Sequence, residues 1–226
     1  MIGTTYIPPA FRVEDPERLA ELVATHPLAA LVLGGDEVVN AVHLPFLRFG
    51  PPREPDQWRF ESHLARANPV AEVLAMDQER PAILIFTGPD AYLTPRWYAD
   101  GQSTSMPTWN YQAVHVRGRV RRVGEDDPAW LDRHLHDLIA THQARIGAAP
   151  FDFTATDLPA RQLAAMKAAI VGIELQVARI EGIEKLSQNK SQADRMGVIK
   201  GLHGRGDAEC SELADLMADL EAGRKD

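Results

Sequence analysis

Three segments of the chain place apolar residues at helical spacing directly after a capping residue and a proline. Proline costs nothing at the first helical position, because its missing N–H would have no partner there. Apolar side chains then recur every three or four residues, which is typical of helices with one buried face. We therefore predict three helices. The first begins at Asp15-Pro16 and ends near His26, and the second begins at Asn68-Pro69 and ends before Pro81. The third, which is the longest, begins at Asp127-Pro128 and ends near Gly147.

Stretches rich in β-branched and aromatic residues separate these helices. They predict about six strands, at residues 28–33, 38–49, 57–63, 82–86, 113–123 and 170–180. Gly34-Gly35-Asp36 predicts a hairpin between the first two strands, which makes them antiparallel. Strands in hairpin order with short helices between them favour a mainly β fold with α-helices (α+β). Within that class we expect a closed or split antiparallel β-barrel instead of a doubly wound parallel sheet.

The C-terminal part of the chain carries two further helical patterns. Ser191 with Asp194 resembles a capping box, and the helix that it opens is expected to end at Gly204. Beyond a turn-rich segment, an apolar stripe on an acidic background predicts a tail helix, through Leu213, Leu216, Met217 and Leu220. We predict a barrel domain at 1–204 and a helical tail at 205–226 that docks on its own domain or on a twin subunit.

Composition narrows the class of protein. The 226 residues are 45% apolar and 25% charged, as in a globular protein that buries a sizeable core. Lys and Arg total 24 against 32 Asp and Glu, and the net charge of -8 disfavours a protein that coats duplex DNA. The single cysteine, Cys210, excludes an internal disulfide, so we expect a cytoplasmic location. We expect neither a standard export signal nor membrane insertion.

Several well-known catalytic motifs are absent from the sequence. It contains no GxxxxGK[ST], GxGxxG, HExxH, paired CxxC or GxSxG pattern. His134 and His136 stand two residues apart on a predicted helix, which points their rings in different directions. We therefore interpret both as solvated helix surface and predict no metal site.

The segment FESHLARANP carries the first group of candidate binding residues. A strand ends and a helix begins here, so Ser62, His63, Arg66 and Asn68 gather at one corner. The free N–H groups of a helix start, together with a forked guanidinium, suit a phosphate. In the alternative interpretation, Asn68 only caps its helix and Arg66 is merely solvated.

Aromatic residues make up 7% of the chain but concentrate in two nearby segments. Two interpretations are open: these aromatic side chains stack on a flat ring system of a ligand, or they close one end of the barrel as an aromatic plug. The residues are Tyr92, Trp97, Tyr98, Trp109 and Tyr111. Asn110 would need a buried partner under both interpretations.

Two further segments are rich in polar groups. In 113–123 the valines point to one side of the predicted strand, and basic side chains point to the other. This basic row is either a solvated face or a surface that contacts an anion or nucleic acid. It consists of His115, Arg117, Arg119 and Arg121. The segment KLSQN also has two interpretations. Its polar side chains either form hydrogen bonds to the amide edges of a heterocycle or form hydrogen bonds to one another within a turn. They are Lys185, Ser187, Gln188 and Asn189.

Five ordered motifs give the chain a resemblance to a known family. TYIPPAFR, HLARANP, FTGPDAYLTPRWY, PTWNYQAVHVRGR and KLSQNKSQADRMGVI resemble the PaiB family of FMN-binding negative transcriptional regulators, from about Tyr6 to about Leu202. This resemblance implies a split-barrel fold like that of pyridoxamine phosphate oxidase and flavin reductases. It also implies a homodimer with FMN bound at the subunit interface.

Site residues follow from the resemblance by position. Ser62, His63, Arg66 and Asn68 match the segment that holds the flavin phosphate and ribityl chain in related split barrels. Thr108, Trp109, Asn110 and Tyr111, together with Lys185, Gln188 and Asn189, are implied to face the cofactor cleft. The chain differs from the family pattern at Ile183-Glu184, where many members have a basic residue followed by an aromatic one.

The leading functional hypothesis is a dimeric FMN-binding protein, either a flavin-dependent oxidoreductase or a flavin-sensing transcriptional regulator. No dedicated catalytic residue is required, because a flavin ring carries the electrons itself. One alternative is a DNA-associated regulator without flavin, although no basic recognition helix is apparent. Another is a split-barrel enzyme that handles haem, since the chain has eight histidines, among them His63 and His203.

Overall fold

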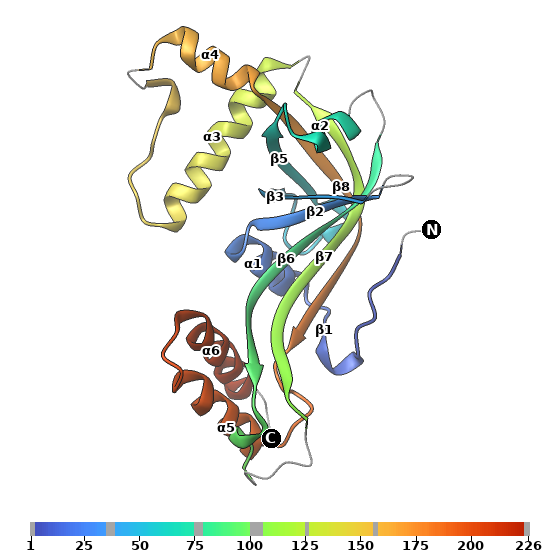
Figure 1. The fold of residues 1–226 in the computed structure, drawn as a ribbon, viewed down its shortest axis with the longest axis vertical. Coiled ribbons are helices and arrows are strands. Elements are labelled where there is room, and N and C mark those ends of the chain that lie inside the picture. The colour runs from blue at the N-terminus through green and yellow to red at the C-terminus, as the bar shows by residue number, and fades with distance from the viewer. Residues whose placement is uncertain are drawn as a thin grey trace. The chain divides into compact units, whose positions relative to one another are not determined.

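The computed structural model describes residues 3–34, 39–74, 79–99, 106–124, 127–155 and 158–223 (Figure 1). Contacts divide the chain into two compact units. The first unit comprises Met1–His26, Phe86–His115 and Glu181–Asp226, and the second comprises Pro27–Ile85 and Val116–Ile180. Three long strands contribute residues to both units, namely β6 (Arg80–Leu93), β7 (Thr108–Val123) and β8 (Ile170–Lys185).

The strands of the described residues form one eight-stranded sheet. Its order is β3-β2-β6-β7-β8-β5-β4, and β1 pairs with β8. The five shorter strands are β1 (Arg12–Val13), β2 (Leu28–Gly34), β3 (Val39–Pro45), β4 (Leu47–Phe49) and β5 (Arg59–Ala65). The pairs β1–β8, β2–β3, β4–β5 and β5–β8 are antiparallel. The expected antiparallel α+β fold is thereby confirmed; the turn at Gly35-Asp36 lies outside the described residues.

Several strands differ in extent from the prediction. The stretch predicted as one strand at 38–49 forms two strands that are separated by buried Phe46, whose N–H donates to Pro27 O at 2.9 Å. Gly88 and Pro89, which were expected to lie beyond a strand end, lie inside β6. Tertiary pairing therefore overrides the local preference of these residues to break a strand.

The three predicted Asp/Asn-Pro helices are present. They are α1 (Pro16–Thr25), α2 (Pro69–Val73) and α3 (Pro128–Arg145). The side chains of Asp15, Asn68 and Asp127 accept hydrogen bonds from backbone N–H groups in the first helical turn, as expected for N-caps. One helix was missed, α4 (Ala160–Ala168), which buries no residue and so lacks an apolar stripe. Short 3₁₀ helices occur at Pro9–Phe11, Pro55–Gln57, Pro95–Trp97 (η3) and Phe153–Ala155.

The core of the first unit includes both predicted C-terminal helices. Helices α5 (Gln192–His203) and α6 (Ala208–Ala222) pack side by side (Figure 1), and Ser191 caps α5 as predicted. Leu213 and Met217 of the tail are buried in one cluster with Leu93 and Val198. The tail therefore packs within its own unit, while the proposed domain boundary at 204 remains a prediction.

The second unit has its own core. Large, almost fully buried side chains come from β2, β5, β6 and β8, among them Leu31, Phe60, Leu84 and Ile173. Within the described part of the chain, no helix combines the length and the apolar character needed to cross a membrane.

Candidate functional site

The corner predicted to hold a phosphate lies in the second unit. Ser62 is fully buried on β5, and its hydroxyl donates to Pro45 O at 2.7 Å. Arg66 donates from Nε to Ala168 O at 3.0 Å and from its terminal nitrogen to Ile170 O at 3.3 Å. Asn68 accepts from the N–H of Val70 at 2.9 Å, as the capping interpretation expects. These side chains thus have partners within the chain, and their role in binding remains a prediction.

His63 meets a residue that the sequence interpretation placed in solvent. His134 is 0% exposed, so the prediction that it lies on a solvated helix surface is wrong, whereas His136 is exposed as predicted. His134 Nε2 lies 3.1 Å from His63 Nδ1, and the ring of His134 stacks on Trp130. The α3 face that carries His134 packs against β5 and β8, a long-range contact that helical spacing alone does not reveal.

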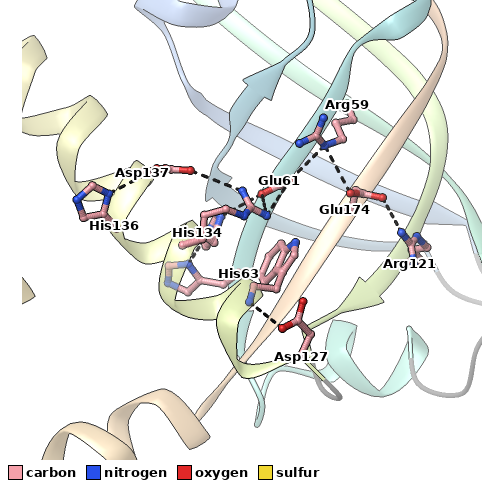
Figure 2. A network of polar contacts seen from close by, with 11 residues as sticks. Arg59, Glu61, His63, Arg121, Asp127, His134, His136, Asp137 and Glu174 are labelled. Atoms are coloured by element: carbon pink, nitrogen blue, oxygen red, sulfur yellow. Dashed lines mark hydrogen bonds and ion pairs between the residues drawn. The ribbon is translucent and has the colours of Figure 1, made fainter. Parts of the chain in front are cut away.

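A network of charges surrounds this histidine pair (Figure 2). Glu61 of β5 is 1% exposed and accepts hydrogen bonds from Arg59 Nε at 3.2 Å and from Arg133 at 3.2 Å. Glu174 pairs with Arg121 at 2.9 Å and lies 3.7 Å from Arg59. The sequence analysis missed Glu61. Alternation along the strand would place Glu61 on the face opposite Phe60 and Ser62, yet all three positions are buried, so the sequence gives no local signal for it.

The network shifts the ionisation of two of its members. Burial, followed by the neighbouring His134, lowers the pKa of His63 to about 4, so its ring is neutral at neutral pH. Burial alone would raise the pKa of Glu61. The facing imidazole of His134 and the charges of Arg133 and Arg59 outweigh burial, and they hold the Glu61 pKa below its usual range.

The predicted aromatic cluster separates into two kinds of residue in the first unit. Tyr98 is buried under the ammonium of Lys190, and Trp97 packs closely against Gly201, as an aromatic plug would. Tyr92 and Trp109 instead form an edge-to-face pair with ring centroids 6.1 Å apart, and they remain 44% and 52% exposed. These two rings are therefore accessible for stacking in this unit.

Polar residues of PTWNY and KLSQN meet in the first unit. Asn110 is fully buried, as expected of a residue that needs a partner, and its amide donates to Ser187 Oγ at 3.0 Å. Lys185 donates to the hydroxyl of Thr108, and burial lowers the pKa of its ammonium. The structure thus joins the two motifs through Asn110–Ser187 and Thr108–Lys185.

The turn that follows β8 is closed largely by its own side chains. Gln188 Oε1 accepts from the N–H of Leu186 at 2.7 Å, and the Gln188 amide donates to Glu184 O. Ser187 adopts the left-handed conformation with φ of 62°. Asn189 is exposed. For Gln188, the geometry matches the self-satisfied turn that was the alternative to a contact with a heterocycle.

Glu184, at the position that departs from the family pattern, is buried. Its Oε1 accepts from Arg18 Nε and from Gln112 Nε2, both at 2.7 Å. The carboxylate is therefore neutralised by a cation of α1 within the same unit.

Two arginines of the basic row on β7 form ion pairs with acidic residues. Arg119 donates to Glu79 at 2.9 Å, Arg121 pairs with Glu174, and His115 Nδ1 lies 2.8 Å from Thr5 Oγ1. Val114, Val116 and Val120 are buried, and Arg119 and Arg121 on the other side of the strand are exposed, as predicted. Ion pairing reduces the positive field that this row offers to an anion.

Each unit contains groups of a kind that flavins contact in proteins. The first unit offers two accessible rings, Tyr92 and Trp109, and an ammonium beside a hydroxyl at Lys185 and Thr108. The second unit offers the exposed guanidinium of Arg66. Aromatic surface, hydrogen-bonding groups and cations are the donor set that suits a flat ring with a phosphate tail.

Comparisons with known proteins identify the family of the chain. A family model described as "Putative FMN-binding domain" matches residues 5–179, which include HLARANP and PTWNY. Protease synthase and sporulation protein PAI 2 of Bacillus subtilis (strain 168) is 28% identical over 215 residues, covering 95% of this chain and 97% of that protein.

Solved structures share the fold at low sequence identity. The FAD and heme binding protein from Mycobacterium smegmatis has a TM-score of 0.53 at 18% identity, over 82% of this chain and 78% of its own. The flavocytochrome Anf3 from Azotobacter vinelandii has a TM-score of 0.53 at 16% identity, over 82% and 75%. The expected split-barrel fold is confirmed.

Proposed function

The chain belongs to the PaiB-type family of FMN-binding split-barrel proteins, and from this membership we propose that it is a homodimeric protein that binds FMN. The observation that carries the proposal is the family match, which spans 5–179 and so both units. We propose a cytoplasmic protein whose flavin serves either a redox reaction or the sensing step of a transcriptional regulator.

Each group of residues has a proposed role toward FMN. Trp109 and Tyr92 would contact the ring by stacking, and Thr108 with Lys185 would hydrogen-bond to polar atoms of the ligand. Arg66 would hold the phosphate by charge. Bound FMN would supply electron transfer at its ring, and the chain would orient that ring and exclude water from it.

Titration with FMN and riboflavin tests these roles. Trp109→Ala should weaken the binding of both ligands about tenfold, because stacking does not involve the phosphate. Met196→Ala is the matched control, since both side chains are 52% exposed, and it should leave both affinities unchanged. Equal affinities for the wild type and Trp109→Ala would contradict the assignment of the ring site.

The phosphate contact has a separate test. Arg66→Gln should weaken FMN binding about tenfold and leave riboflavin binding unchanged, because only FMN carries the phosphate. Arg66 also bonds to two carbonyl oxygens, so urea unfolding of the variant must accompany the titration. Losses of equal size for the two ligands would assign Arg66 a structural role.

Analytical ultracentrifugation tests the proposed dimer.

The geometry bears on both alternatives. Arg119 and Arg121 are paired with Glu79 and Glu174, which weakens the case for direct contact with DNA through this strand. Haem ligation by His63 would use Nε2, because Nδ1 lies 3.1 Å from His134 Nε2. His203 is the more accessible candidate, 3.6 Å from Asp215. A haemin titration that gives no Soret shift in the wild type would remove the haem alternative.

A further inference from the structure

Glu61, His134 and His63 form a chain from the interior of the second unit toward its surface (Figure 2). Glu61 Oε2 lies 3.8 Å from His134 Nδ1, and His134 Nε2 lies 3.1 Å from His63 Nδ1. His134 Nδ1 makes no hydrogen bond to the described residues, so the carboxylate acts on it by charge alone. Two of the three side chains are almost fully buried, and only His63 is partly exposed.

Glu61 determines which nitrogen of a neutral His134 ring carries the proton. The single negative charge of Glu61 already faces the guanidinium groups of Arg59 and Arg133, both within hydrogen-bond distance. A neutral ring facing a carboxylate carries its proton on the nearer nitrogen, here Nδ1, because the carboxylate can only accept.

This tautomer determines the orientation of the next ring. With its proton on Nδ1, His134 has a lone pair at Nε2, so the contact at 3.1 Å requires His63 to donate from Nδ1–H. His63 Nε2 then carries a lone pair, and it has no hydrogen-bond partner among the described residues. Trp130 stacks on His134 at 5.0 Å with 8° between the planes and so holds the middle ring in place.

We propose that His63 Nε2 is a fixed hydrogen-bond acceptor that receives an O–H or N–H group of the ligand, and that this position does not bind an anion. The ligand's identity rests on the proposed function, under which the donor is a hydroxyl of the ribityl chain of FMN. The low pKa of His63 agrees with this role, because a neutral ring offers no charge to a phosphate. Glu61 and His134 are positioning residues.

Nitrogen NMR of the histidine rings tests the acceptor in the protein without added ligand. The expected result at neutral pH is Nδ1–H on both His63 and His134, with His63 Nε2 unprotonated. In His134→Phe, which keeps a ring against Trp130 but no nitrogen, His63 should lose this fixed preference and populate Nε2–H. A wild-type His63 with its proton on Nε2 would overturn the inference.

A chemical probe gives a second readout without ligand. Diethyl pyrocarbonate acylates accessible, unprotonated imidazole nitrogens, so His63 should still react at about pH 5, well above its pKa of about 4. His136, which is 70% exposed, is the internal control that shows the reagent is active. Loss of His63 reactivity at about pH 5 would overturn the inference.

Flavin titrations then identify the donor. His63→Phe should weaken FMN and riboflavin about tenfold each, since both carry the ribityl hydroxyls, and His136→Phe should weaken neither. A loss confined to FMN would mean contact with the phosphate and would overturn the inference. If the wild type binds neither flavin, the proposed function fails. The NMR measurement of which His63 nitrogen carries the proton then tests the inference without any flavin.

Discussion

Gly172 of β8 lies directly opposite His63 of β5 in the antiparallel register of the two strands. A Cβ atom at Gly172 would lie 2.2 Å from Trp130 Cζ3, far inside van der Waals contact. The missing side chain therefore leaves the space in which Trp130 packs and stacks on His134. One glycine thus allows α3 to approach β8 and to place His134 against His63.

Gly172→Ala should lower the free energy of unfolding by about 1–3 kcal/mol, because the indole must move to accommodate the new methyl group. It should also move the pKa of His63 toward its ordinary value as the ring pair loosens. Urea denaturation and histidine NMR measure the two effects. Gly34→Ala is the control: a Cβ there meets nothing within 4 Å, so a loss of similar size would contradict the packing argument.

Stability should fall in mild acid because of His63. Its pKa is 6.5 in the unfolded chain and about 4 in the folded one. Between these values the unfolded chain binds a proton that the folded chain does not, so the free energy of unfolding decreases as pH falls from 6.5 to about 4. The loss is about 2 kcal/mol, after allowance for the ring's partial exposure. Above pH 6.5 this contribution is complete.

Urea unfolding across this pH range, with a matched variant, isolates the effect. Burial also lowers the pKa of His142, which adds to the slope in the same direction. His63→Gln should therefore have a shallower slope than the wild type, and His142→Gln should retain the His63 contribution. An unchanged slope in His63→Gln would mean that His63 titrates normally in the folded protein.

The buried pair of Arg18 and Glu184 predicts a non-additive effect. Arg18→Gln leaves Gln112 as the hydrogen-bond partner of the carboxylate among the described residues, and should cost about 1–3 kcal/mol in urea unfolding. The double variant Arg18→Gln with Glu184→Gln should recover most of this loss, because no buried charge remains. Glu21→Gln removes the exposed partner of Arg18 and should cost under about 1 kcal/mol. Additive losses would contradict the pairing.

The tail helix should be required for the stability of the first unit. Leu213 is fully buried against α5, so Leu213→Ala should lower the free energy of unfolding by about 2–4 kcal/mol. Asp219→Ala, on the exposed face of the same helix, should change it by under about 0.5 kcal/mol. A chain ending at Gly204 should melt at a lower temperature than the full chain. An unchanged melting temperature would instead support an independent domain at 1–204.

Features with a local cause could be predicted from the sequence. The caps at Asp15, Asn68 and Asp127 and the C-terminal stripe through Leu213 depend on residues within a few positions of one another. Gly88 and Pro89 misled the prediction of β6, because pairing with neighbouring strands outweighs their local preference.

The histidine pair could not be predicted in the same way. His63 and His134 are 71 positions apart, and their contact depends on the β5–β8 register and on space beside Gly172. His134 lies four residues after Trp130 and four before Leu138, so helical spacing places it beside apolar side chains but does not reveal which strand residue it meets. The same holds for Glu61, whose partners come from β5 and α3.

Equilibrium dialysis of the purified full-length protein against FMN, followed by its visible absorption spectrum, tests the central claim most directly. The account predicts saturable binding of one FMN per chain, with a yellow protein whose flavin absorption bands differ from those of free FMN. A colourless protein that retains no FMN at saturating concentrations, although it is folded by circular dichroism, would contradict it.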